Sequence, residues 1–202
     1  MYQQTVIIVG VGALGSHVAQ LLRNEANLFV IDFDRVEAKN VLSQFHGKPN
    51  VGKGKVAALQ QTMNFLWGLK VDGASVKLVD NNVDVLLGRE FKWPENIVRK
   101  ADLVIDCLDN GEARRLVQNW VRAHKMPCLH GALAADGAFG RVIWDEHFVV
   151  DDTTAGAATC EDGAHLPFIM TVSALIARSV QVFLHQSKRQ GWSIAPTRIE
   201  MV

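Results

Sequence analysis

The stretch TVIIVGVGALGSHVAQLLRNE, residues 5–25, decides the fold of this chain. Its first part is a β-branched run that ends in glycine, which predicts a buried strand over 5–10. Its second part places four apolar side chains on one stripe at helical spacing, which predicts a helix over 13–25. A buried strand that leads directly into an amphipathic helix is the first unit of an α/β fold.

Three glycines join this strand to this helix, and they stand in G-x-G-x-x-G spacing: Gly10, Gly12 and Gly15. Glycines allow a tight turn and a close backbone approach, and the helix N-terminus offers N–H groups and a positive dipole end to a phosphate. Asp32 ends the next expected strand, 27–32, at a spacing where an acidic side chain accepts hydrogen bonds from a ribose diol. The pattern predicts a nucleotide site; the alternative is a tight turn without a ligand.

Strands and helices alternate along the rest of the chain. Further strands are expected over 27–32, 74–80, 98–107 (after the end of a helix), 126–132 and 138–146, and helices over 52–67 (after a loop), 112–125 and 166–191, the last stopped at Gly191. Residues 147–164 are small, polar and acidic, which predicts an exposed mobile loop, and the tail after 191 is compatible with an edge strand. We expect a doubly wound, mostly parallel, Rossmann-like α/β sheet with a long C-terminal helix, in a single domain over 1–202.

Composition narrows the classes of function. The chain has 202 residues, enough for one core, with 21 basic and 21 acidic side chains, so charge gives no footprint for nucleic acid or an anionic membrane. The N-terminus lacks the pattern of a signal peptide, and we expect no transmembrane segment. Three cysteines without a CxxC pair fit a reducing compartment and exclude a four-cysteine zinc site. We therefore expect a cytoplasmic protein.

A cluster of polar side chains after the second strand favours ATP over a nicotinamide cofactor. A dehydrogenase needs one acid there, whereas DFDRVEAKNVLSQ, residues 32–44, carries a second aspartate, and VGKGK, residues 51–55, adds two lysines. The side chains expected to contact nucleotide are Asp34, Lys39, Asn40, Gln44, Lys53 and Lys55. Such a cluster suits a triphosphate with Mg²⁺ and would damage a nicotinamide site.

Five ordered motifs resemble one family. GVGALG, DFDRVEAKN, VGKGKVAAL, DLVIDCLDN and ATCEDGA stand in the order and spacing of the ThiF/MoeB-type adenylating enzymes, bacterial relatives of ubiquitin-activating enzymes, over about residues 5–185. The resemblance implies an ATP-binding domain, usually paired as a homodimer or pseudo-dimer. It also implies adenylation of the C-terminal carboxylate of a small ubiquitin-like or sulfur-carrier protein with a glycine tail, and a possible downstream transfer enzyme.

The resemblance assigns three catalytic positions. Asp109 matches the magnesium aspartate, and it also follows a strand end that overlooks the crevice where such sheets bind ligands. Lys55 matches the phosphate-contacting lysine. Cys160 matches the cysteine that takes the activated carboxylate in many members, here as a thioester, and its place before a helix suits an activated thiol. The alternative for Cys160 is an inert, exposed thiol.

Other polar residues near Asp109 have structural alternatives. Asn110 is expected to cap the next helix while touching the adenylate, and Asp106 to support the loop through backbone N–H groups. Arg114 falls at the family's arginine position and either supports Asp109 or lies on a solvated helix face. We expect His130 to be a hydrogen-bonded structural histidine, with a contact to the nucleotide or the substrate tail as the alternative. We expect Cys107 and Cys128 to be packing residues.

Two departures from the family leave other functions open. The family's zinc-binding cysteine pairs are absent, and Ser43 stands where N-x-x-R-Q usually has arginine. Phosphate neutralisation then depends on the lysines or on another subunit. The alternatives are a non-catalytic partner subunit that binds nucleotide or the small protein, and an NAD-dependent oxidoreductase, which rests on the glycine motif alone.

Overall fold

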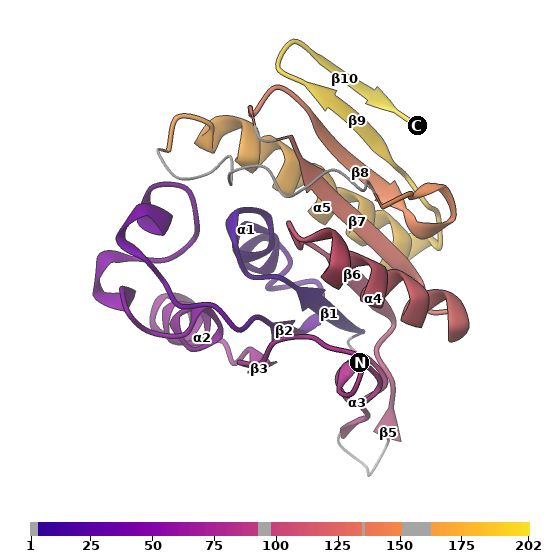
Figure 1. Ribbon diagram of the computed structural model, residues 1–202, viewed down its shortest axis with the longest axis horizontal. Helices are drawn as coiled ribbons and strands as arrows, with labels where there is room; N and C mark the ends of the chain where they lie inside the picture. The colour runs from indigo at the N-terminus through magenta and orange to yellow at the C-terminus, as the bar shows by residue number, and fades with distance from the viewer. Residues whose placement is uncertain (1–3, 93–97, 135, 151–162) are drawn as a thin grey trace.

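A computed structural model describes residues 4–92, 98–134, 136–150 and 163–202 (Figure 1). Its main sheet has the strand order β10-β9-β8-β7-β6-β1-β2-β3. The strands are β1 Thr5–Val9, β2 Asn27–Ile31, β3 Asp72–Ala74, β6 Leu103–Asp106, β7 Cys128–Leu133, β8 Gly140–Trp144, β9 Trp192–Ala195 and β10 Arg198–Met201. The strands from β3 to β7 pair in parallel, and β8, β9 and β10 extend the sheet by antiparallel pairing.

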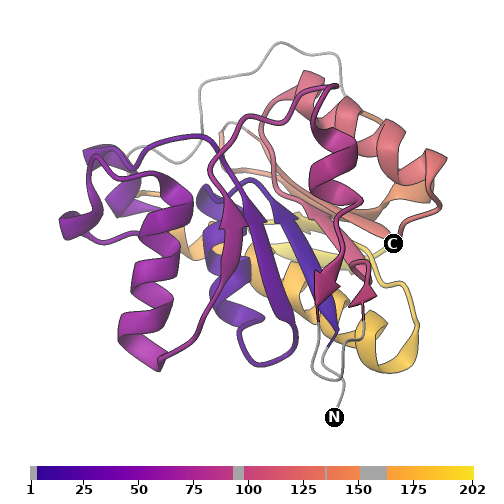
Figure 2. The same cartoon turned by 90° about the horizontal axis from the view of Figure 1, so that it is seen from below.

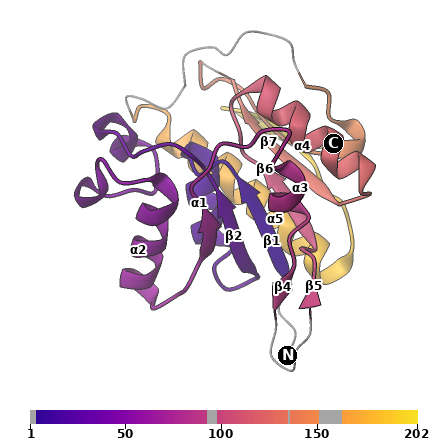
Figure 3. The same cartoon turned by 60° about the horizontal axis from the view of Figure 1, so that its bottom comes forward.

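Helices cover both faces of this sheet, as Figure 2 and Figure 3 show from two sides. The helices are α1 Ala13–Leu21, α2 Lys55–Trp67, α3 Val83–Leu87, α4 Gly111–Ala123 and α5 Leu166–Gln186, with 3-10 turns η1 Ala38–Leu42, η2 Lys48–Asn50 and η4 Asp145–His147. Helices α1, α2 and α5 share one apolar core, and α3 and α4 share the other. The expected doubly wound, mostly parallel Rossmann-like fold with a long C-terminal helix is therefore confirmed.

The strand sequences feed both cores because side chains alternate across a sheet. Along β1, Val6 and Ile8 point into the core under α1 and α5, whereas Ile7 and Val9 point into the core under α4. All four side chains are almost fully buried. This two-sided burial is why the strand reads as a continuous apolar run in the sequence.

Three expected elements have different bounds. Instead of a strand over 74–80, only β3 pairs with β2, because β2 itself ends opposite Ala74 and leaves no partner beyond it. Instead of the end of a helix before β6, the chain forms β5 Val98–Arg99, which pairs with β4 Phe91–Lys92. Helix α5 ends at Gln186 rather than near Gly191, because Ser187 takes a left-handed φ of 55°. The tail adds the edge hairpin β9–β10.

Helix α5 is long and apolar enough to cross a membrane, by length and composition only. The apolar composition of this helix is explained by its place in the core, since Ile169, Val172, Ile176 and Val180 are fully buried against the sheet. A core helix of a soluble domain passes the same test of length and composition. Helix α5 therefore packs on one face of the sheet as part of the core.

Candidate nucleotide site

The turn between β1 and α1 is built so that two of its three glycines are required by the fold. Gly10 has a φ of 91°, and a side chain there would approach the Cys107 carbonyl oxygen to 2.8 Å. A methyl group on Gly15 would overlap the Gly10 carbonyl oxygen. Gly12, just before α1, has only the Gln44 Nε2 atom nearby, at 4.0 Å from a Cβ position. The protein itself has room for a Cβ atom at Gly12, which precedes a helix N-terminus of the kind that binds phosphate in other proteins.

Asp32 fastens this turn to the end of β2. Its carboxylate accepts hydrogen bonds from the Val11 N–H at 2.6 Å and from the Asp34 N–H at 2.8 Å. Burial raises the pKa of Asp32, an effect that the neighbouring Lys55 opposes. Asp32 thus lies beside the glycine turn as the motif requires, and its contact with a ribose stays a prediction.

Lys55 begins α2 and is buried at the same end of the sheet. Its ammonium group lies 2.9 Å from the Asp34 carboxylate, and the backbone N–H of Lys55 donates to the backbone carbonyl of Asp34. The structure therefore brings together Asp32, Asp34 and Lys55. Lys53 differs, because its exposed ammonium group donates to Gln61 on the flank of α2 at 2.6 Å.

Asn40 and Gln44 lie in the crossing segment, residues 38–46, which contacts α1 through hydrogen bonds to Ser16 and His17. Asn40 is buried, and its side chain accepts the Glu37 N–H at 2.8 Å, so it closes the 3-10 turn η1. Gln44 is near Gly12, and its buried Oε1 has no hydrogen-bond partner among the described residues. Of the two, Gln44 is the side chain with an unused polar atom beside the glycine turn.

Two histidines that the sequence analysis did not place also lie against this segment. His46 Nε2 bonds to the Val11 carbonyl at 3.1 Å, and His17 Nε2 bonds to the Ser43 carbonyl at 3.0 Å. Burial lowers the pKa of both, that of His46 to about 4. As neutral rings, His46 holds the crossing segment to the glycine turn, and His17 holds it to α1. Neither has a ligand-like spacing in the sequence, so nothing in the pattern could have revealed them.

Asp109 is an exposed residue in a loop whose two flanks are fixed. Before it, the Asp106 carboxylate accepts the Leu108 N–H at 2.9 Å, and the Arg114 guanidinium donates to the Leu108 carbonyl. After it, the Asn110 side chain caps α4 by accepting two N–H groups, at 2.9 and 3.2 Å. The expected roles of Asp106 and Asn110 in holding the loop and capping the helix are confirmed.

Arg114 is buried, so the alternative of a solvated helix face is wrong for this residue. Its guanidinium reaches back under the loop, where it bonds to the Leu108 carbonyl and, at 2.6 Å, to the Gly131 carbonyl. The side chain also lies 3.5 Å from the Asp106 carboxylate. Because Leu108 immediately precedes Asp109, Arg114 supports Asp109 through the backbone.

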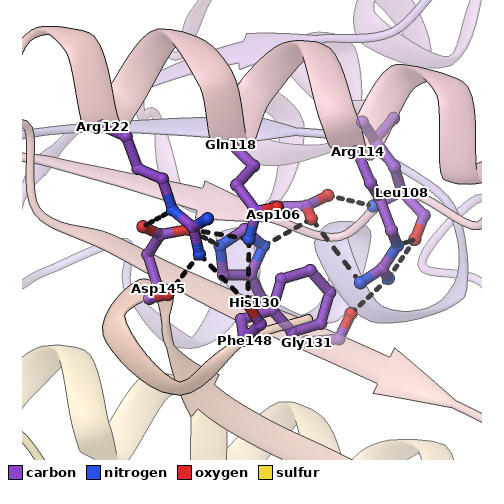
Figure 4. A network of polar contacts seen from close by, with 9 residues as sticks. All are labelled: Asp106, Leu108, Arg114, Gln118, Arg122, His130, Gly131, Asp145 and Phe148. Carbon is purple, nitrogen blue, oxygen red and sulfur yellow. Dashed lines mark hydrogen bonds and ion pairs between the residues drawn. The ribbon is translucent and has the colours of Figure 1, made fainter. Parts of the chain in front are cut away.

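A fully buried histidine joins this loop to the antiparallel part of the sheet (Figure 4). His130 lies 2.7 Å from Asp106 and 3.2 Å from Asp145, one carboxylate for each ring nitrogen. Burial alone would lower the pKa of His130, but Cys128 and the two carboxylates raise it to about 11. Burial alone would likewise raise the pKa of Asp106, which Arg114 and His130 hold below its usual range. The expectation of a hydrogen-bonded structural histidine is confirmed.

The remaining members of this network were not found from the sequence. Asp145 also accepts hydrogen bonds from Gln118 at 3.1 Å and Arg122 at 2.8 Å. Phe148 stacks on the His130 ring with centroids 3.9 Å apart. Gln118 and Arg122 are four residues apart on α4, so their helical spacing was the available signal, but it is shared by many solvated helix faces.

Two of the three cysteines are packing residues, and the third lies outside the described part of the chain. Cys107 and Cys128 are held in apolar surroundings, and burial raises the pKa of both thiols, which fits the expected packing role. Cys160, and with it most of the expected mobile loop, lies outside the described residues. Among the residues that are described, no group of three His, Cys, Asp or Glu side chains could hold a metal ion.

The candidate site lies at the carboxyl ends of three adjacent parallel strands. The glycine turn follows β1, Asp32 follows β2 and Asp109 follows β6, and these strands are neighbours in the order β6-β1-β2. Open α/β sheets bind ligands in the crevice at this end. Fold and site thus have the arrangement of a doubly wound α/β domain with a candidate nucleotide crevice at this end of the sheet.

Comparison with known proteins makes the class specific. The model of the ThiF family matches residues 1–194, and the chain belongs to this family. Ubiquitin-like modifier-activating enzyme 5 of Caenorhabditis briggsae is 35% identical over 148 residues, which cover 71% of this chain and 34% of that protein. The enzyme of the same name from Culex quinquefasciatus is 31% identical over 125 residues, 57% of this chain and 30% of that protein. The chain spans about a third of the length of the curated relatives it matches.

Solved structures agree on the fold. E. coli MccB with ATP superposes with a TM-score of 0.76 at 16% identity, over 98% of this chain and 62% of that chain. The crystal structure of PaaA superposes with a TM-score of 0.71 at 16% identity, over 99% of this chain and 64% of that chain. At these identities the likeness shows a shared fold.

Proposed function

We propose that this chain uses ATP and Mg²⁺ to adenylate the C-terminal carboxylate of a small protein of the ubiquitin-like or sulfur-carrier type. The observation that carries the proposal is the meeting of the glycine turn, Asp32, Lys55 and Asp109 at one end of the sheet. The names of the relatives, which activate ubiquitin-like modifiers, and the structures of MccB with ATP and with MccA support the substrate class.

In the proposed reaction, a carboxylate oxygen of the small protein attacks the α-phosphate of ATP. The bond from the α-phosphorus to the bridging oxygen breaks, pyrophosphate leaves, and an acyl-adenylate remains. Both reactants are anions, so the protein contributes positioning and charge neutralisation. Mg²⁺, when bound, neutralises phosphate oxygens as charge develops on them.

The residues fit this chemistry in distinct ways. The N-terminus of α1, with open space at Gly12, accepts phosphate oxygens, and Asp32 stands where it can accept the ribose hydroxyls. Lys55, already paired with Asp34, supplies a buried positive charge. Asp109 offers an exposed carboxylate to Mg²⁺, a ligand type that this ion prefers. Asn40, Gln44, Lys53 and Asn110 remain proposed nucleotide contacts.

Cys160 is proposed to take the activated carboxylate from the adenylate. Its thiolate attacks the acyl carbon, AMP leaves, and a thioester forms. The adduct should appear when ATP and the small protein are present, disappear on treatment with excess thiol, and be absent from Cys160→Ala. An adduct that survives this substitution assigns the nucleophile to another residue.

ATP–pyrophosphate exchange tests the adenylation itself. The purified chain is incubated with candidate small proteins that end in Gly-Gly, and exchange is expected with the cognate one and lost in Asp109→Ala. The proposal is abandoned if no candidate supports exchange, or if Asp109→Ala exchanges as fast as the wild type.

A partner subunit without activity of its own is a second candidate function. Ser43 replaces the family's arginine and is almost fully buried, with its carbonyl held by His17. No phosphate charge is therefore neutralised from this position. This candidate predicts exchange only when a second, paired chain is added, which the same assay measures; a homodimer or pseudo-dimer would supply the missing charge.

A further inference from the structure

The buried contact between His130 and Asp106 leads directly to the backbone of the Asp109 loop (Figure 4). The Asp106 Oδ2 atom forms a hydrogen bond with His130 Nδ1 at 2.7 Å, and the Oδ1 atom of the same carboxylate accepts a hydrogen bond from the Leu108 N–H at 2.9 Å. Both side chains have no exposed surface. The imidazole ring therefore fixes the rotation of the carboxylate, and the carboxylate fixes the peptide that enters Leu108.

The next peptide, between Leu108 and Asp109, is held by the second buried cation. Arg114 donates to the Leu108 carbonyl and also to the Gly131 carbonyl at 2.6 Å, next to His130 on β7. With Asn110 fixed as the cap of α4, Asp109 is exposed between two anchored neighbours. His130, through Asp106, and Arg114 thus hold the two backbone groups of Leu108 that precede Asp109.

The two nitrogen atoms of the His130 ring contact different parts of the structure. Nδ1 faces Asp106 and thus the Asp109 loop, whereas Nε2 faces Asp145, which Gln118 and Arg122 bind from α4. No hydrogen bond or ion pair joins Asp145 to Leu108. Each carboxylate also has an arginine close by, Arg114 at 3.5 Å from Asp106 and Arg122 at 2.8 Å from Asp145. Loss of one end of the ring therefore leaves neither buried carboxylate without a cation.

We propose that His130 is a positioning residue for Mg²⁺: through Nδ1, Asp106 and the Leu108 N–H it sets the direction in which Asp109 presents its carboxylate to the ion. The inference rests on the proposed function, because it takes Asp109 as the magnesium ligand. It adds a residue that touches neither nucleotide nor metal. Groups that orient a metal ligand from behind commonly change metal affinity by about 10- to 100-fold when they are removed.

Two amide substitutions separate the two ends of the ring. The amide nitrogen of asparagine is bonded to Cγ, as His130 Nδ1 is, so His130→Asn keeps a donor toward Asp106 and loses the contact with Asp145. The amide nitrogen of glutamine is one bond further out, as Nε2 is, so His130→Gln keeps the contact with Asp145 and loses that with Asp106. Both remove the ring that stacks on Phe148, and asparagine, the shorter side chain, loses more packing than glutamine, so a larger Mg²⁺ gain in His130→Asn is not an effect of packing.

The readout is the affinity for ATP by titration calorimetry, with excess Mg²⁺ and with EDTA. The gain in affinity on adding Mg²⁺ should be clear in the wild type and absent in Asp109→Ala. His130→Asn should keep most of this gain, whereas His130→Gln should lose about 10- to 100-fold of it while binding metal-free ATP as before. Amide hydrogen exchange at Leu108 should be faster in His130→Gln than in His130→Asn.

Each other outcome has a definite meaning. Equal Mg²⁺ gains in the two variants overturn the positioning role and leave the proposed function standing. A wild-type chain whose ATP affinity ignores Mg²⁺ overturns the proposed function together with this role. If neither variant folds, Asp145→Asn decides. An unchanged Mg²⁺ gain supports the path through Asp106, and a lost gain overturns it, because the whole network then acts as one structural unit.

Discussion

At the scale of single residues, the three glycines of the β1–α1 turn have separable roles. Gly12→Ala should fold with wild-type stability, because the nearest atom to its Cβ is 4.0 Å away, but it should weaken ATP binding by filling the phosphate space. Gly15→Ala should lower the melting temperature, because its methyl group overlaps the Gly10 carbonyl. Thermal unfolding and ATP titration of both variants check this; equal melting temperatures would contradict it.

Lys55 gives the second prediction at this scale. Lys55→Gln should weaken binding of MgATP by about 10- to 100-fold, since a hydrogen bond from a charged donor contributes about 1.5–3 kcal/mol. The matched control is Lys70→Gln, which removes an exposed lysine paired with Asp72 at 3.2 Å near the start of β3. Equal affinities of the two variants, measured by calorimetry, would remove Lys55 from the site.

At the scale of elements, Asn110 connects the stability of α4 to the geometry of the loop. Asn110→Ala removes both cap hydrogen bonds and should reduce the free energy of unfolding by about 0.5–2 kcal/mol. Asn110→Ser keeps a side-chain acceptor and should recover most of this loss. Denaturant unfolding of the two variants gives the difference; a serine variant as unstable as the alanine variant would mean that the cap has no part in it.

The elements also show how far the sequence leads. β1, α1, β2 and α4 were predictable because each has a periodicity that its own burial produces, two-sided for the strands and one-sided for the helices. The strand expected over 74–80 failed because a strand needs a partner, and the end of β2 is set by tertiary structure. Its alternating pattern arises instead from a loop in which Leu78 is buried.

In the candidate site, the residues in motifs could be predicted from the sequence, and the residues that support them could not. Residues in motifs, such as Gly10, Asp32 and Asp109, could be placed from their position after strand ends. The residues that hold them could not, since His130 and Asp145 meet only when β7 and the end of β8 pair in the folded sheet. A buried histidine between two carboxylates leaves no recognisable pattern in the sequence, because its partners lie 24 and 15 residues away along the chain.

At the scale of the whole molecule, two buried histidines, His130 and His46, contribute to the pH dependence of stability in opposite directions. His130 has a pKa raised to about 11, so its contribution is fully present below the unfolded value near 6.5 and is lost as pH rises toward 11. His46 has a pKa lowered to about 4, so its contribution is fully present above 6.5 and is lost as pH falls to about 4. Together they favour a stability maximum near neutral pH.

The acid side of this maximum gives the last prediction. The change in the pKa of His46 from 6.5 to about 4 corresponds to about 3 kcal/mol of stability lost between these pH values, because the unfolded chain takes up a proton that the folded one refuses. His46→Gln cannot titrate, and its amide can still donate to the Val11 carbonyl, so its free energy of unfolding should fall less steeply from pH 6.5 to 4 than that of the wild type. His147→Gln, at an exposed position, is the control and should keep the wild-type slope. Urea unfolding at half-unit pH steps measures the slopes, and parallel curves for His46→Gln and the wild type would show that burial of His46 does not shape the acid limb.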